Sequence, residues 1–203
     1  MQRSKNTPEL PPGIAVLVIA AALAANIGLN AANNALSLPF FFDSIGTAVV
    51  AATVGLVPGL VVAIGTNALI EVLNGFPWIH LPFAVCGMAT AVIIWAFVRK
   101  NAFGNIGTVL LVSLLVAFAN SILGGVIASF VYGGVTGVGV DYLVTGLVAA
   151  GQSIVSAAFW ARLPANLFDK TIAVLAAYGA HRYLARATAT SHPDRPGISA
   201  NTR

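Results

Sequence analysis

The sequence predicts an all-α membrane protein with six transmembrane helices, because one bilayer crossing takes about 20 apolar residues and the chain has room for about six. Of its 203 residues, 58% are hydrophobic and 8% are charged, and the mean hydropathy is +0.90. Soluble domains carry a charge on about a quarter of their residues. The few charges also fall in the breaks between long apolar stretches. Composition and charge placement therefore indicate the same fold class.

Successive breaks between the apolar stretches alternate in the sign of their charge. Asp43, Glu71 and Asp141 occupy one set of breaks, whereas Arg99, Lys100 and the two ends of the chain occupy the other. Lys and Arg are retained on the cytoplasmic side of a membrane. The pattern predicts cytoplasmic termini and acidic loops that face outward. The net charge of +4 reflects this topology and not a nucleic-acid partner, because no Lys/Arg cluster interleaves with aromatic residues.

The first apolar stretches are expected to form one long span and a compact reversal. A span at 13–32 follows basic residues, as in a signal peptide, but the apolar stretches downstream favour a span that is retained. Shorter apolar pieces at 44–56 and 59–73 flank the sequence GLVPG at 55–59. Proline lacks a hydrogen-bond donor and glycine permits positive φ, so the two pieces are predicted to reverse tightly within the bundle.

The next two spans are expected at 80–98 and 105–132. Arg99 and Lys100 end the first of them on the cytoplasmic side, and a glycine-rich outer loop at 133–139 follows the second.

The last third of the chain contains two further apolar segments, 142–161 and 165–184, separated by Arg-Leu-Pro at 162–164. If both crossed the membrane, the Arg-bearing tail would end outside, against the positive-inside tendency. The sequence therefore predicts that only the last segment crosses, and that 142–161 is an extra re-entrant or interfacial helix before the last span.

The chain is thus expected to divide into three parts. Residues 1–12 form a cytoplasmic N-terminus, residues 13–185 form the six-helix transmembrane domain, and residues 186–203 form a disordered cytoplasmic tail. The sequence has no G-x-x-x-x-G-K-[ST], H-E-x-x-H or G-x-S-x-G motif, so we expect no enzyme activity. The single Cys86 excludes an internal disulfide, and no Cys/His pair has the spacing of a metal site.

Ionisable residues in the last span are candidates for ligand contact. Asn166 and Lys170 lie one helical turn apart. A charged side chain in apolar surroundings is costly unless it is paired or hydrated, so it marks a functional hypothesis. The alternative is a structural ion pair of Asp169 with Lys170 or Arg162.

Polar residues on two other spans add to the candidates. Asn120 lies within the fifth span and should face inward, towards a ligand or a neighbouring helix. Asn67, Glu71 and Asn74 follow an i, i+4, i+7 spacing that places them on one helix face. Solvation of an outer loop is the alternative for this face.

Aromatic residues flank the same outer loops. Trp78 and His80 precede the fourth span, where they could contact a ligand or form an interfacial belt. The three phenylalanines at 40–42 could cover a pocket or anchor the loop at the interface.

Small residues in the first span form two overlapping A-x-x-x-A pairs. Ala20 pairs with Ala24, and Ala21 pairs with Ala25. Small residues one turn apart let another helix approach closely.

The order of these motifs resembles the substrate-binding S components of energy-coupling factor (ECF) transporters. The resemblance covers about residues 13–184 and includes A-x-x-x-A in the first span, LPFFFDSIGT at 38–47, GLVPG at 55–59 and LPANLFDKT at 163–171. It implies a bacterial inner-membrane subunit that captures a small water-soluble vitamin or precursor on its outer face. It also implies docking on a transmembrane coupling protein and two ATPase subunits, which use the ATP, so this chain needs no cofactor of its own.

The resemblance also implies roles for individual residues. In riboflavin-binding members an Asn of the fifth span and an Asn and Lys of the last span contact the ligand, which corresponds here to Asn120, Asn166 and Lys170. Asp169 stands where those members have the Lys, so riboflavin is not the expected ligand. The A-x-x-x-A residues correspond to the coupling interface. The full set of expected substrate contacts is Asn67, Glu71, Trp78, His80, Asn120, Asn166 and Lys170. A vitamin-uptake-like membrane ligand sensor is the alternative function.

Overall fold

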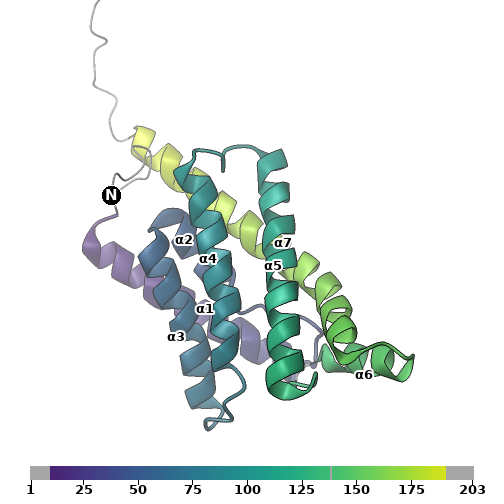
Figure 1. The fold of residues 1–203 in the computed structure, drawn as a ribbon. Helices are drawn as coiled ribbons and strands as arrows, with labels where there is room; N and C mark the ends of the chain where they lie inside the picture. The colour runs from purple at the N-terminus through teal and green to yellow at the C-terminus, as the bar shows by residue number, and fades with distance from the viewer. Residues whose placement is uncertain (1–9, 138, 191–203) are drawn as a thin grey trace, which may run out of the picture.

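The computed structural model describes residues 10–137 and 139–190 (Figure 1). These residues form α-helices and one 3₁₀ turn, and the described part of the chain contains no strand. The elements are α1 Pro12–Ala35, α2 Ile45–Thr53, α3 Leu56–Leu73, η1 Leu81–Phe83, α4 Ala84–Arg99, α5 Ile106–Tyr132, α6 Asp141–Ala149 and α7 Ile154–Thr190. In Figure 1, α3, α4 and α5 stand side by side, while α1 and α7 cross behind them. The all-α fold predicted from the sequence is confirmed for these residues.

Four segments of the described chain are long and apolar enough to cross a membrane: α1, α3, η1 with α4, and α5. Of the other helices, α2 has only 9 residues, and α7 has 37 residues but carries Arg162, Asp169 and Lys170. The protein is therefore an α-helical membrane protein by the length and composition of its helices, and the count of six spans stays a prediction.

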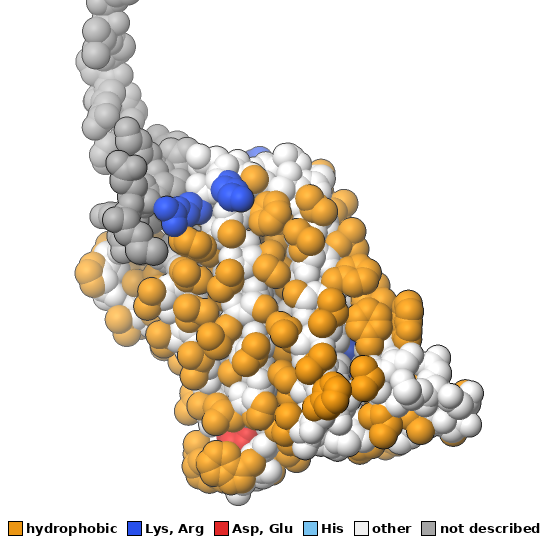
Figure 2. All heavy atoms as spheres, viewed as in Figure 1, with side chains coloured by type: hydrophobic (Ala, Val, Ile, Leu, Met, Phe, Trp, Pro, Cys, Tyr) orange, Lys and Arg blue, Asp and Glu red, His pale blue; other side chains and the backbone are white. Residues whose placement is uncertain are grey.

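On the face of the bundle shown in Figure 2, apolar side chains cover most of the sides, and most of the visible charged side chains lie near the two ends. The outward face of α5 alone exposes Leu110, Leu114 and Phe118. Arg99 ends α4 and Lys100 follows it, at the end of the bundle shown uppermost in Figure 1, which we call the basic end. The opposite end, which we call the acidic end, is reached by the last turn of α3, which includes Glu71. A surface of this kind is suited to lipid around the sides and to water at the two ends.

The predicted reversal between the second and third helices is confirmed, and it is shorter than expected. Only Val54 and Gly55 separate α2 from α3. Gly55 has a φ of 128°, a left-handed value that glycine adopts without the clash of a Cβ. Pro58 lies in the first turn of α3, where a missing N–H leaves no helical hydrogen bond unmade. Local chemistry explains this turn fully.

The end of the chain differs from the prediction in two ways. The expected single helix over 142–161 is divided, because α6 ends at Ala149 and Gly151, with a φ of 93°, turns the chain before α7. The expected break at 162–164 is absent, because α7 continues through Pro164. An interior proline costs a helix about 3 kcal/mol, but α7 packs along α5 and α2, and this packing keeps it continuous.

The predicted disordered tail is also corrected. Because α7 extends to Thr190, residues 186–190 are helical. The predicted tail beyond them, and residues 1–9 of the predicted cytoplasmic N-terminus, lie outside the described residues.

The main cluster of buried apolar side chains lies in the half of the bundle nearest the basic end, and a smaller one packs α6 against α7. It is built mainly from fully buried small and branched side chains, among them Ile94 of α4, Val112 and Val116 of α5, and Ala173 and Ala177 of α7. Small residues allow helices to approach closely without polar groups between them. The charged residues buried inside the bundle and the cavity that some of them line lie instead towards the acidic end.

A cysteine-accessibility experiment tests the predicted orientation. In a Cys86→Ser background, Lys100→Cys should resist a membrane-impermeant maleimide applied to intact bacterial cells, because Lys100 is exposed at the basic end. Asn74→Cys, which is exposed at the acidic end, serves as the matched control and should react. Labelling of position 100 without labelling of position 74 would invert the topology.

Candidate functional site

A cavity of about 70 Å³ lies inside the bundle towards the acidic end. Its walls come from α1, α4, α5, α7 and the loops that precede α2, α4 and α6. The cavity brings together four of the residues predicted from the sequence, His80, Asn120, Asn166 and Lys170. Small-molecule sites in proteins usually measure about 300 to 1,000 Å³. The volume here favours a ligand with few heavy atoms, or loops that widen around a larger one.

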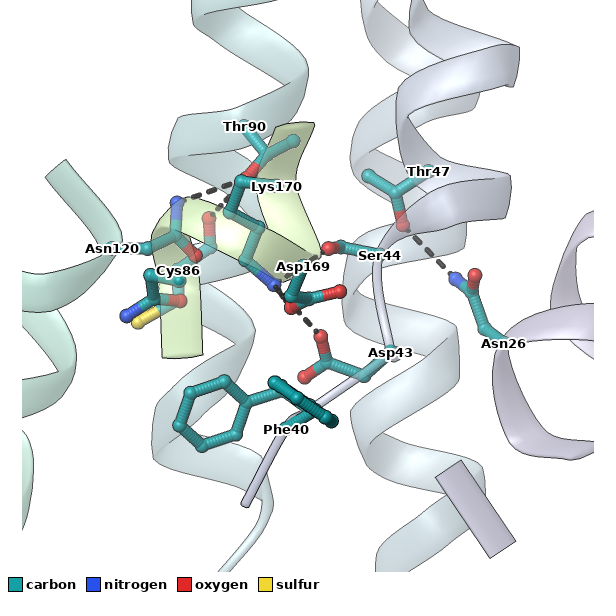
Figure 3. A network of polar contacts seen from close by, with 12 residues as sticks. Asn26, Phe40, Asp43, Ser44, Thr47, Cys86, Thr90, Asn120, Asp169 and Lys170 are labelled. Carbon is teal, nitrogen blue, oxygen red and sulfur yellow. Dashed lines mark hydrogen bonds and ion pairs between the residues drawn. The ribbon is translucent and has the colours of Figure 1, made fainter. Parts of the chain in front are cut away.

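Lys170 is the most completely paired charge in this region (Figure 3). Its Nζ donates to Ser44 Oγ at 2.8 Å, Asp43 Oδ1 at 3.3 Å and Asp169 Oδ2 at 2.5 Å. These three contacts use all three donors of the ammonium group. The alternative pairing of Lys170 with Asp169 is therefore present, and Lys170 ties α7 to the loop before α2.

Asp43 connects this tie to the cavity. Its side chain is 24% exposed, whereas that of Lys170 is 2% exposed and that of Asp169 is fully buried. Asp43 lines the cavity, and Asp169 does not. Lys170 thus holds a carboxylate at the cavity wall, where Asp43 can accept a hydrogen bond from a ligand. The sequence places Asp43 in an outer acidic loop and does not predict that its carboxylate lines the site.

Asn120 and Asn166 present their carbonyl oxygens as acceptors. Nδ2 of Asn120 donates to Thr90 Oγ1 at 3.0 Å and to Val116 O at 2.9 Å, as Figure 3 shows for Thr90. Nδ2 of Asn166 donates to Ser121 Oγ at 3.1 Å. Neither Oδ1 atom accepts a hydrogen bond from a described residue. Both amides are therefore fixed by neighbouring groups on one side and open to a donor on the other.

Glu71 and its two predicted companions do not line the cavity. The Glu71 carboxylate accepts the backbone N–H groups of Ile79 at 3.2 Å, His80 at 2.6 Å and Leu81 at 2.9 Å. Asn67 donates to Ala63 O within its own helix. Trp78 is 65% exposed. Glu71 instead shapes the segment that places His80 at the cavity.

Glu71→Gln is expected to lower the free energy of unfolding by about 1 to 3 kcal/mol, because hydrogen bonds to a charged group are stronger than those to a neutral one. Denaturant unfolding of the purified protein in detergent measures this change. Asn74→Ala, on the exposed end of the same helix face, should change stability by no more than about 0.5 kcal/mol. Equal effects of the two substitutions would show that Glu71 has no special positioning role.

The phenylalanines of the loop before α2 have separate positions. Phe41 lines the cavity, and its ring lies 5.8 Å from Lys170 Nζ. Phe40 and Phe42 pack on Phe168 of α7, at ring-centre distances of 4.7 Å and 6.4 Å. Aromatic contact with α7 therefore anchors the loop, and one of the three rings reaches the site.

Arg162 is, with Asp43, a charged cavity residue that the sequence analysis did not select as a ligand contact. It lines the cavity and is 1% exposed, although Arg162 was considered only as an ion-pair partner of Asp169. Its carboxylate neighbour is instead Asp141, with Nη2 and Oδ1 3.7 Å apart. The signal was present in the sequence, as a charge between two apolar segments, but the adjacent proline led to its interpretation as a helix break.

The small residues of α1 face away from the bundle. Ala20, Ala21, Ala24 and Ala25 are all exposed. The helix is held instead by the buried Asn26, whose Nδ2 donates to Thr47 Oγ1 at 3.2 Å and Thr66 Oγ1 at 3.0 Å, and whose Oδ1 accepts the Gly46 N–H at 2.7 Å. One polar side chain thus joins α1 to both α2 and α3.

No protein-family model matches the chain, and no curated protein or solved structure is significantly similar to it. Within the described residues, no three His, Cys, Asp or Glu side chains are grouped as metal ligands would be. The class of the protein is defined by its fold and its cavity alone. It is an α-helical membrane protein with a polar cavity inside the bundle, near one end.

Proposed function

We propose that the protein is the substrate-capture subunit of an ATP-driven importer of the ECF type, which binds a small water-soluble vitamin or precursor on its outer face. The observation that carries the proposal is the cavity itself. It is lined by amide, carboxylate, cationic and aromatic side chains, and such a mixture recognises small polar molecules. A purely lipid-exposed bundle has no use for so many buried polar groups, which are costly in a membrane.

The position of the cavity supports capture from outside. It lies towards the acidic end, which the positive-inside tendency places on the outer face. The apolar core lies between the cavity and the basic end. A ligand bound in the cavity would therefore have to pass this apolar core to reach the cytoplasm. Release on the inside requires a movement of the subunit, and the energy for it comes from partner chains.

The exposed face of α1 supports docking on a transmembrane partner. Only 11% of the residues in the most apolar stretch of α1 are buried within the bundle. The exposed residues of this helix include Ala20, Ala21, Ala24 and Ala25. In the proposal this face contacts the coupling protein, and two ATPase subunits hydrolyse ATP. The proposal also has six passes. α7 crosses in addition to the four long apolar segments, and α2, whose 9 residues are too short to cross alone, makes the remaining pass together with the loop before it.

The proposed ligand contacts are the groups that remain open at the cavity. Asn120 and Asn166 offer carbonyl oxygens, Asp43 offers a carboxylate, and His80 offers a ring nitrogen. Lys170 acts mainly by holding Asp43. The proposal therefore treats Asn120, Asn166, Asp43 and His80 as ligand contacts, and Lys170 as the residue that positions Asp43.

Mass spectrometry of small molecules released from the purified, denatured protein tests the proposal. A single water-soluble compound that recurs in independent preparations, and that raises the unfolding temperature of the protein when added back, is expected. A protein that releases no such compound, and that no member of a panel of water-soluble vitamins and precursors stabilises, would contradict the proposed function.

A further inference from the structure

Arg162 is a buried cation whose hydrogen bonding is incomplete. A guanidinium has five N–H donors. Nη1 of Arg162 donates to Ala158 O at 3.3 Å, and Nη2 donates to Thr136 Oγ1 at 3.4 Å. Both distances exceed the usual 2.9 to 3.0 Å of N–H···O bonds, roughly by 0.3 to 0.5 Å. Nε is buried and has no partner among the described residues. A buried charged group in this condition costs free energy until an acceptor reaches it.

The nearest carboxylate does not supply the hydrogen-bond acceptor that the Arg162 guanidinium lacks. Asp141 Oδ1 lies 3.7 Å from Nη2, and Oδ2 of the same carboxylate accepts the N–H groups of Thr136 and Gly137, each at 2.6 Å. Asp141 is therefore held by the loop backbone at a distance from Arg162. Asp43 and Asp169 are both paired with Lys170. Asp141 therefore balances the charge of Arg162 as an ion pair, but none of these three carboxylates is within hydrogen-bonding distance of the guanidinium, and Nε has no acceptor among the described residues.

We propose that Arg162 binds the carboxylate of the ligand, so that the substrate class is small organic acids that also carry N–H or O–H donors. The inference rests on the proposed function and narrows it. A carboxylate beside Arg162 would supply the acceptor that Nε lacks and form a charge-assisted hydrogen bond. The donors of the same ligand would meet the free Oδ1 atoms of Asn120 and Asn166, which line the same cavity.

The cavity also constrains the body of the ligand. Phe41 and Phe83 contribute aromatic walls, and the volume of about 70 Å³ favours a single ring. The probe 4-aminobenzoate combines a ring, a carboxylate and an amino donor, whereas 4-aminobenzamide has almost the same shape without the negative charge. The pair therefore isolates the contribution of the acid group.

The first experiment compares the two probes on the purified full-length protein. Titration at millimolar concentrations should give a dissociation constant about 10- to 150-fold lower for the acid than for the amide, which is the range for a buried hydrogen bond to a charged group. Equal affinities, or stabilisation by the amide alone, would overturn the proposed recognition of a carboxylate.

The second experiment changes Arg162. Arg162→Gln should weaken the binding of 4-aminobenzoate about 10- to 150-fold and that of 4-aminobenzamide much less, so that the preference for the acid is lost. Arg162→Lys should retain part of the preference because it keeps the charge. The double variant Arg162→Gln/Asp141→Asn removes the partner carboxylate as well and protects against misfolding caused by a lone buried charge. A folded Arg162→Gln protein that still prefers the acid would contradict the proposal.

A measurement on the wild type remains decisive if the variants do not fold. The chain has one cysteine, Cys86, which lines the cavity and is partly exposed. A Cβ built on Gly124 would lie 3.6 Å from Arg162 Cδ and 3.8 Å from Cys86 Sγ, so the two side chains adjoin the same point of the wall. 4-Aminobenzoate should slow the reaction of Cys86 with N-ethylmaleimide, and the amide should slow it much less. Identical protection by both would reject the inference.

The outcomes separate this inference from the proposed function. A compound without an acid group that is released from the purified protein and binds it again would refute the role of Arg162 and leave the capture function intact. The absence of any bound or binding small molecule would refute both.

Discussion

Lys170→Ala is expected to lower the free energy of unfolding by about 3 to 5 kcal/mol, because removing one partner of a buried ion pair leaves an uncompensated charge. Asp169 is fully buried and receives the Lys170 ammonium at 2.5 Å, and its Oδ1 has no hydrogen-bond partner among the described residues. Loss of Lys170 also frees the loop that carries Asp43 and Ser44. Denaturant unfolding in detergent, followed by tryptophan fluorescence, measures the change.

The double variant Asp169→Asn/Lys170→Met is the matched control. It removes both charges at once, so it should recover more than half of the stability lost in Lys170→Ala. Direct ligand contact by Lys170, which the sequence analysis predicted, leads to a different result: a stable Lys170→Ala protein with about 10- to 150-fold weaker binding. Unchanged stability of the folded variant would refute the structural tie.

Ala21→Leu is expected to reduce transport while ligand binding is preserved. Ala21 is exposed on α1, and a larger side chain there would hold a partner helix away. Overpacking of a close contact costs about 1 to 3 kcal/mol, so association with the coupling protein should weaken about 5- to 150-fold. Uptake of the identified ligand into cells and its binding to the isolated subunit are the two measurements.

Ala22→Leu provides the contrast at the neighbouring position. Ala22 is 6% exposed and packs against Gly46, where the backbones of α1 and α2 meet so closely that a Cβ on Gly46 would collide with Ala22. This substitution should reduce the amount of folded protein, and with it both binding and uptake. Equal loss of binding and uptake in Ala21→Leu would remove the proposed interface from this face of α1.

The helices were predictable where local chemistry determines them. The apolar stretch at 105–132 became α5, and Asn105 caps it by accepting the Thr108 N–H at 2.8 Å. Gly55 likewise marks the reversal between α2 and α3. Pro164 misled the prediction, because its local effect is overridden by the packing of α7 on α5 and α2, which no local signal reports. Gly151, which does turn the chain, was visible in the sequence but was placed inside a helix.

Part of the site was also predictable from the sequence. Polar residues in apolar stretches must find partners, so Asn120, Asn166 and Lys170 could be selected from sequence, and they do meet at one cavity. Spacing cannot show which partner each residue finds. Glu71 shares a helix face with Asn67, but its carboxylate is occupied by backbone N–H groups of a loop.

The central claim is that a small ligand occupies the cavity beside Gly124. An added methyl group there would meet its neighbours at ordinary contact distances of 3.6 to 3.9 Å, whereas a leucine side chain would fill the space. Mass spectrometry of compounds released from wild type, Gly124→Ala and Gly124→Leu tests the claim most directly. The proposal predicts the same compound from the first two proteins and its loss from folded Gly124→Leu. Equal occupancy in all three folded proteins, or no compound from any of them, would contradict it.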